Sequence, residues 1–191
     1  MAPRVPKTEI TGFTGSMVKR FSRKMLGEVP EPLGVLWHHR RVLMDTMRLG
    51  GKANKWDAAD KSLKSFAHMA VAAQVGCGFC LDLGYFQAQN ENLDLAKASQ
   101  VPRWRESDVF TPLERDVLEY AEAMTNTPPT VTDELSARLL DRLGPAAMVE
   151  LTAFIALSNF MTRNNTALGI ESQGFSSACA VPLAGTGAAT P

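Results

Sequence analysis

Two cysteines three positions apart, Cys77 and Cys80, stand between two stretches of helical character. Residues 65–75 before them are rich in alanine and poor in β-branched side chains, which favours a helix over a strand. Residues 81–89 after them continue in a helical rhythm, so Gly76 is placed to end one helix and the cysteines to open the next. A thiol in the first turn of a helix faces unpaired N–H groups and the positive end of the helix dipole, which both favour the thiolate.

The rest of the chain also has the spacing of helices, and no segment alternates polar and apolar residues convincingly as a half-buried strand would. The strongest helix start combines Thr111 as N-cap, Pro112 at the first helical position and Glu114 in a capping box. Asp57 is expected to cap the helix that leads to the cysteines. These patterns predict an all-α fold. The other expected helices cover residues 16–25, 33–48 (closed by Gly50 and Gly51), 132–144 and 146–165, and residues 100–108 are expected to form a loop.

The segment 146–165 is the most apolar part of the chain, with charges only at Glu150 and Arg163. A helix that is apolar nearly all round should be buried within the fold or at a subunit contact. Glu150 is therefore expected to pair with a buried base. The alternative is that it reaches a pocket.

The chain of 191 residues is long enough for one domain with a sizeable core. Its content of 45% hydrophobic and 21% charged residues is ordinary for a globular protein, so we do not expect disorder throughout. We expect a basic N-terminal extension over residues 1–30 and a helical domain over residues 31–180. The tail, residues 181–191, is mostly small, which predicts disorder there.

The charges balance overall but are distributed unevenly. Twenty basic and twenty acidic residues remove the net positive charge expected of a general nucleic-acid binder. Residues 1–60 hold 11 Lys and Arg against 6 Asp and Glu, whereas residues 61–191 hold 9 against 14. The basic third is either a solvated face or one side of a contact with the acidic remainder, within the molecule or between subunits.

The sequence predicts a cytoplasmic protein with no membrane or nucleic-acid partner. The first ten residues lack the apolar core of a secretory signal, and the least charged stretch, residues 66–81, is too short and too polar to span a bilayer. Three cysteines, an odd number, indicate a reducing compartment rather than a structural disulfide framework.

Cys77 and Cys80 are open to three interpretations: a redox pair, two ligands of a metal, or two small buried residues. A zinc site would need two more ligands, and the sequence has no second CxxC and no HxxxH. It also lacks a phosphate-binding loop, a dinucleotide-binding glycine motif and a nucleophile elbow. We therefore expect neither a metal nor a cofactor.

The Gly76–Cys80 segment, with the helix before it and the later stretch NFMTRNNTALGI at residues 159–170, resembles the carboxymuconolactone decarboxylase-like family. The resemblance is to its alkylhydroperoxidase D-like branch and covers about residues 30–178. It implies an all-helical bundle that assembles into homo-oligomers. It also implies a cysteine pair that reduces hydroperoxides without a cofactor and is reduced again by an external dithiol.

The resemblance implies that Cys80 attacks the peroxide and that Cys77 resolves the product. The peroxidase branch places a glutamate twelve residues before the first cysteine and a histidine four after the second, where this chain has Ser65 and Gly84. His68, one helical turn after Ser65, is the leading substitute base, or else it makes a polar contact in an apolar helix. Asp82 is a second catalytic candidate, with a first-turn acid facing the helix dipole as the alternative.

The leading hypothesis is a thiol-dependent hydroperoxide reductase, an antioxidant peroxidase or disulfide reductase. One alternative is a non-catalytic helical oligomer that binds a small apolar ligand. The other is an enzyme that acts on a lactone or carbonyl compound without using the thiols.

Overall fold

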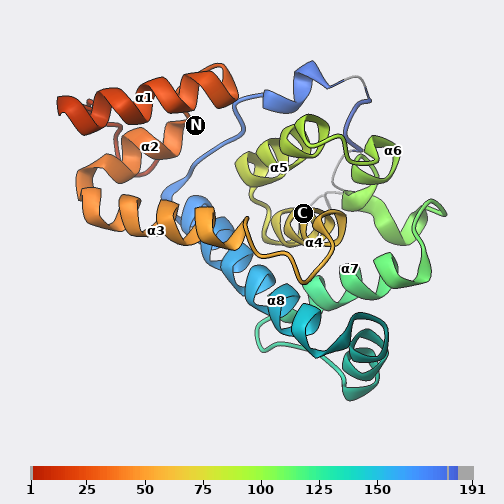
Figure 1. The fold of residues 1–191 in the computed structure, drawn as a ribbon. Helices are drawn as coiled ribbons and strands as arrows, with labels where there is room; N and C mark the ends of the chain where they lie inside the picture. Colours follow the sequence, from red (N-terminus) through yellow and green to blue (C-terminus); the bar gives the residue numbers. More distant parts are fainter. Residues whose placement is uncertain (1, 180, 185–191) are drawn as a thin grey trace.

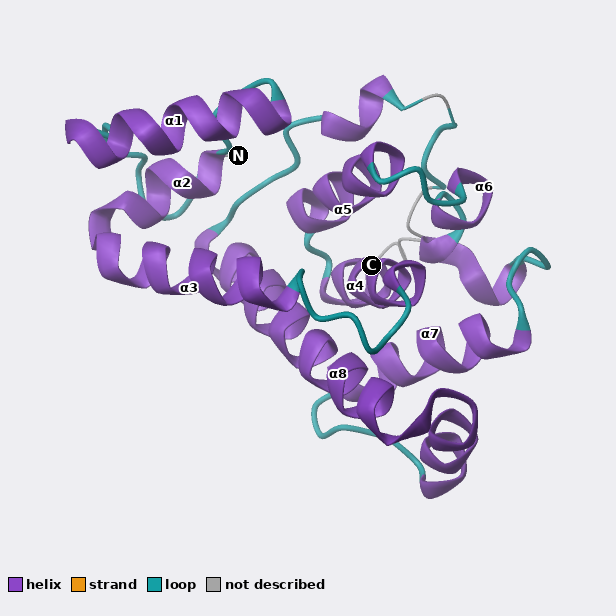
Figure 2. Ribbon diagram, in the orientation of Figure 1, coloured by secondary structure: helices purple, strands orange, loops and turns teal. Residues whose placement is uncertain are grey.

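The computed structural model describes residues 2–179 and 181–184, and every regular element within these ranges is a helix (Figure 2). The expected all-α fold is therefore confirmed. Residues 185–191 of the expected disordered tail lie outside the described residues. The elements are α1 (Gly12–Leu26), α2 (Glu31–Leu36), the 3-10 helix η1 (Trp37–His39), α3 (Arg40–Ala53), α4 (Lys61–Val75), α5 (Gly78–Asn90), α6 (Leu95–Ala98), the 3-10 helix η2 (Val101–Glu106), α7 (Pro112–Thr125), α8 (Asp133–Leu168) and the 3-10 helix η3 (Phe175–Ala178).

Helix α4 lies at the centre of the main core and packs against α5, α7 and α8 (Figure 1). Its side chains at Phe66, Met69 and Val71 have at most 1% of their surface exposed. Large side chains buried this completely each contribute about 1.5–3 kcal/mol through removal of apolar surface from water. The helix that leads to the cysteines is thus packed against three other helices in the main core.

The start of α4 corrects one expectation. Asp60, not Asp57, is its N-cap: the Asp60 carboxylate accepts the N–H groups of Ser62 at 2.8 Å and Leu63 at 3.4 Å. Both aspartates precede the helix, and only the one whose oxygen can reach the first-turn amides can cap it. The capping box at Thr111 and Glu114 is confirmed.

The expected single helix over residues 33–48 is instead two helices, α2 and α3, joined by η1. His39 leaves the helical conformation (φ −131°, ψ 79°), and its Nδ1 accepts a first-turn N–H, so it caps α3. Helix α3 then continues through Gly50 and Gly51, which do not end it. The expected loop over residues 100–108 contains η2.

Helix α8 bends at Gly144 (φ 75°, ψ 167°), directly before Pro145, where the sequence predicts a break between two helices. Beyond the bend, one face holds buried side chains such as Leu151 and Ile155, whereas Val149 and Phe160 on the outer face are 70% and 50% exposed. The helix is apolar and long enough to cross a membrane by composition alone, yet its inner face belongs to the core.

A buried ion pair joins α4 to α8. The Lys64 ammonium lies 2.7 Å from a carboxylate oxygen of Glu150, and the other oxygen accepts the Ala58 N–H at 2.7 Å. The expected pairing of Glu150 with a buried base is confirmed. Because each charge has lost its water, it depends on the other to remain buried.

The N-terminal helices form a second, smaller core in which Val18, Trp37 and Leu43 are buried together. Arg4 connects this part to the end of α8, since its guanidinium donates to the carbonyls of Thr166 at 2.8 Å and Ala167 at 2.7 Å. The segment before α1 therefore packs on the remainder of the molecule.

The chain after α8 lies against α5 and is fastened there by Asp82. The Asp82 carboxylate accepts the N–H groups of Gly174 at 2.8 Å, Phe175 at 3.0 Å and Ser176 at 2.6 Å, as well as the Ser172 hydroxyl at 2.7 Å. Burial would raise the pKa of Asp82, but these hydrogen bonds outweigh burial and hold the pKa below its ordinary value.

We expect Asp82→Asn to lower the free energy of unfolding by about 1–3 kcal/mol at neutral pH, because an amide cannot accept all of these hydrogen bonds. Since the folded pKa lies below the unfolded one, the advantage of the carboxylate is complete above about pH 4 and disappears as pH falls through the folded pKa. Urea unfolding of both proteins as a function of pH measures this, with the exposed Asp141→Asn as the matched control. A pH-independent difference between Asp82→Asn and wild type would contradict this role.

Candidate functional site

The cysteine pair lies at the junction of α4 and α5. Gly76 adopts a left-handed conformation (φ 76°, ψ 28°) and ends α4, as the sequence predicts. Cys77 is the N-cap of α5, and Cys80 lies in its first turn. The two form a disulfide with Cα atoms 5.3 Å apart. The sharp glycine turn thus brings both sulfurs to the mouth of one helix.

The surroundings of the two sulfurs differ. The Cys77 sulfur accepts the Cys80 N–H at 3.3 Å, so the helix-end amide points to Cys77. Cys77 is 1% exposed and Cys80 is 4% exposed, but Cys80 lines a cavity of about 190 Å³. The other walls of this cavity are mainly apolar and come from α5 and α8: Phe79, Leu83, Phe154, Leu157 and Met161. A small molecule in the cavity would meet Cys80.

His68 of α4 lines the same cavity as Cys80. Its Nδ1 lies 3.1 Å from the hydroxyl oxygen of Ser158, which also lies 2.9 Å from the Phe154 carbonyl oxygen. Nδ1 of His68 and the Ser158 hydroxyl thus share a hydrogen bond whose donor depends on the tautomer of the ring. Burial lowers the pKa of His68, although an interaction with the Cys80 backbone acts in the opposite direction. The ring is thus neutral near pH 7.

A second cavity of about 350 Å³ adjoins the first, and His68 lines both. Ser65 and Gly84, the positions of the family's glutamate and histidine, also line the second cavity. A Cβ atom on Gly84 would lie only 3.1 Å from Cδ2 of His68 and 3.3 Å from Cγ of Met69. The His68 ring therefore occupies the space that a side chain at position 84 would need.

Asn165 is a site residue that the sequence analysis does not identify. This α8 side chain is 7% exposed, and its amide Nδ2 donates to the Cys80 sulfur at 3.4 Å. It lies within the NFMTRNNTALGI stretch that carries the family resemblance, but its contact spans 85 residues of sequence. Ser158, the partner of His68, is likewise distant in sequence.

Asp82 is not among the residues that line either cavity, because its carboxylate faces the segment 172–176 on the other side of α5. The structure therefore brings Cys77, Cys80 and His68 together but turns Asp82 away from them. Its contacts are those of a residue that holds the chain after α8 in place.

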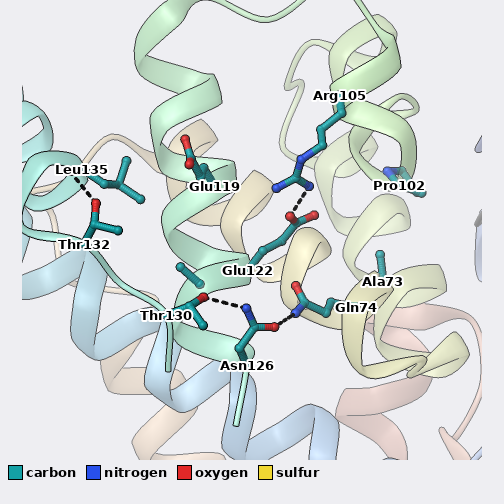
Figure 3. A pocket seen from close by; sticks show the side chains of 11 residues that line it. Ala73, Gln74, Pro102, Arg105, Glu119, Glu122, Asn126, Thr130, Thr132 and Leu135 are labelled. Carbon is teal, nitrogen blue, oxygen red and sulfur yellow. Dashed lines mark hydrogen bonds and ion pairs between the residues drawn. The ribbon is translucent and has the colours of Figure 1, made fainter. Parts of the chain in front are cut away.

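A third cavity, of about 460 Å³, lies elsewhere, between α4, η2, α7 and the start of α8 (Figure 3). Its polar side chains are engaged with each other: Gln74 donates to Asn126, Asn126 donates to Thr130, and Arg105 pairs with Glu122. It contains no cysteine or histidine. Within the described part of the chain, no three His, Cys, Asp or Glu side chains are grouped to hold a metal.

The uncharacterized protein YnjA of Escherichia coli (strain K12) is 34% identical to this chain over 163 residues, which are 84% of this chain and 87% of YnjA. Among solved structures, an uncharacterized peroxidase-related protein from Ralstonia eutropha JMP134, described as an alkylhydroperoxidase AhpD core, matches with a TM-score of 0.81 and 16% identity. The match covers 95% of this chain and 98% of that one. The debrominase Bmp8 matches with a TM-score of 0.75 and 21% identity, over 85% of this chain and 88% of its own.

The sequence pattern of the carboxymuconolactone decarboxylase family matches residues 42–123, a span that contains both cysteines, His68 and most of the central core. Together with the similarity to YnjA over most of both chains, this match gives the resemblance noted in the sequence a firm basis. This chain belongs to the carboxymuconolactone decarboxylase family and has the fold of its alkylhydroperoxidase D-like members.

Proposed function

We propose that the protein is a thiol-dependent hydroperoxide reductase in which Cys80 attacks the substrate and Cys77 resolves the product. The observation that carries this proposal is the position of Cys80, which lines an apolar cavity and is already within bonding distance of a second sulfur. Asn165 donates to the Cys80 sulfur, and a donor at this point would also stabilise a thiolate.

In the proposed cycle the Cys80 thiolate attacks the distal oxygen of a hydroperoxide, and the O–O bond breaks. The alkoxide takes a proton and leaves as an alcohol, while Cys80 becomes a sulfenic acid. The Cys77 thiolate then attacks the Cys80 sulfur, forming the disulfide and releasing the oxygen as water. An external dithiol opens the disulfide by exchange and is itself oxidised.

His68 is the proposed base that takes the Cys80 thiol proton. Its neutral state near pH 7 and its position in the wall of the Cys80 cavity support this role. On taking a proton, the ring gains a second N–H, and the Cys80 backbone favours this charged form. The proposal also includes a cytoplasmic location, where a dithiol reductant is available, and assembly into homo-oligomers.

A second candidate, reductive debromination of a small aromatic compound, is favoured by one observation. The wall of the Cys80 cavity contains the aromatic rings Phe79 and Phe154. A cysteine-to-alanine variant of the debrominase Bmp8, with a TM-score of 0.76 to this chain, was solved with 2,3,4-tribromopyrrole. Assaying bromopyrrole and cumene hydroperoxide in parallel separates the two candidates.

We expect Cys80→Ser to abolish steady-state reduction of cumene hydroperoxide with dithiothreitol as reductant, and Cys179→Ser to leave it unchanged. Cys77→Ser should slow it, because dithiothreitol must then react with the Cys80 sulfenic acid directly. Mass spectrometry of the reduced proteins after one equivalent of peroxide distinguishes the two roles. Wild type should lose two hydrogens between Cys77 and Cys80, and Cys77→Ser should gain one oxygen at Cys80.

Other outcomes of that experiment select the alternatives. Turnover of a lactone or carbonyl compound that survives both substitutions would indicate an enzyme that does not use the thiols. Wild type that neither turns over peroxide nor changes mass would indicate a non-catalytic helical oligomer.

His68→Ala should slow alkylation of Cys80 by iodoacetamide about tenfold at neutral pH, which corresponds to a rise of one unit in the thiol pKa. The measurement uses a Cys77→Ser background, so that only Cys80 reacts at this site, and His38→Ala serves as the surface control. Because burial lowers the pKa of His68, the rate of the Cys77→Ser parent should begin to fall only below the ordinary histidine value of about 6.5. Identical pH profiles for His68→Ala and its parent would remove His68 from the mechanism.

Asn165→Asp should slow the same alkylation more than Asn165→Leu does, because the aspartate places a negative charge beside the sulfur in addition to removing the amide donor. Asn164→Asp, one residue away, is the matched control for added charge on α8. Equal rates for Asn165→Asp and Asn165→Leu would show that Asn165 only fills space.

A further inference from the structure

Helix α1 presents an unpartnered apolar stripe to solvent. Phe13, Met17, Phe21 and Met25 recur every four residues and are 83%, 58%, 57% and 55% exposed. The helix does have a partner on another face, where Gly15, Val18 and Ser22 are buried against the small N-terminal core. The stripe is therefore a second apolar face that packing within this chain does not use.

The charges on α1 all have one sign. The helix carries Lys19, Arg20, Arg23 and Lys24 and contains no aspartate or glutamate. Within the described residues, none of these four side chains forms an ion pair. Arg40, Arg41 and Arg48 of α3 line a shallow hollow together with Thr14 of α1 and a single carboxylate, Asp45, so basic side chains are in excess on the neighbouring surface as well. In Figure 1, α1 lies along the outer edge of the molecule.

The stripe ends at the candidate site. Met25 and Leu26, the last residues of α1, line the cavity of about 350 Å³ that also contains Ser65 and His68. This cavity shares His68 and Phe154 with the cavity of Cys80. A partner that covered the stripe would therefore lie beside the cavity that adjoins the candidate site.

We infer that α1 docks this protein on an anionic lipid surface, with the Phe13–Met25 stripe in the headgroup region and its lysines and arginines on the lipid phosphates. A basic helix with a stripe of aromatic and methionine side chains suits the boundary between headgroups and acyl chains. Each basic side chain near such a surface adds to binding. Binding of this kind to a membrane surface needs no membrane-spanning segment.

A second copy of the chain fits this stripe less well. A symmetric contact of α1 with α1 would bring eight cations together without a carboxylate. The outer face of α8 is apolar at Val149 and Phe160. The nearby Glu150 is already paired with Lys64, so its carboxylate is not free to pair with the cations of α1. The exposed Leu140 lies on α8 and the exposed Val109 in the loop between η2 and α7, both in the acidic part of the chain.

The test is co-sedimentation of the full-length protein with vesicles of phosphatidylcholine alone and of phosphatidylcholine with an equal part of phosphatidylglycerol. Wild type should bind only the vesicles that contain phosphatidylglycerol, and should be released when salt is raised from about 0.1 M to about 1 M. Arg20→Gln/Arg23→Gln should weaken binding on the order of 30-fold, from the loss of two cations. Phe13→Ser/Phe21→Ser should also weaken binding, whereas Val149→Ser/Phe160→Ser on α8 is the control and should bind as wild type does.

The measurement does not depend on catalysis, so it stands apart from the proposed peroxidase activity. Wild type that does not bind the anionic vesicles, or that binds both vesicles equally, would overturn the inference. So would undiminished binding by the α1 variants. Sedimentation equilibrium of Phe13→Ser/Phe21→Ser supplies the remaining outcome: a lower particle mass than wild type would show that a second copy covers the stripe.

Discussion

The candidate site depends on the turn between α4 and α5. Because Gly76 adopts a left-handed conformation, the chain leaves the central core helix and starts the next one within two residues. That reversal makes Cys77 an N-cap and places Cys80 one turn further on, beside a cavity whose opposite wall is α8. Helix α8 in turn carries Ser158 and Asn165, which contact His68 and Cys80. The surroundings of the pair are therefore set by three helices that pack against one another, α4, α5 and α8.

Local signals in the sequence predicted the elements that local chemistry determines. Gly76 ends a helix and Thr111 begins one, because each needs only its own backbone or side chain to do so. The sequence did not decide between two similar residues that could both cap the same helix. Asp57 and Asp60 have the same capping group, and only tertiary placement of the chain decides which one reaches the helix amides. The helix break at His39 likewise has no strong local signal, and a pair of glycines continues a helix where the sequence predicts its end.

The site could be predicted in part, for the same reason. Cys77, Cys80 and His68 belong to adjacent helices, so a short stretch of sequence contains their relation. Asn165 and Ser158 come from the far end of the chain, and nothing local to them indicates that a sulfur or an imidazole lies opposite. Asp82 is close to the cysteines in sequence, yet it faces the segment after α8. Cys80 and Asp82 are close in sequence, yet within a single turn of α5 their side chains point to different parts of the structure.

The close fit of His68 over Gly84 links two positions that sequence comparison would treat as independent. A Cβ atom at position 84 would lie closer to the imidazole ring and to Met69 than ordinary packing allows, so one of these side chains would have to shift by a few tenths of an ångström. A histidine placed on α5 at this position would therefore press first on the histidine of α4. The two positions belong to one packing contact, and a substitution at either of them is expected to alter the tolerance of the other.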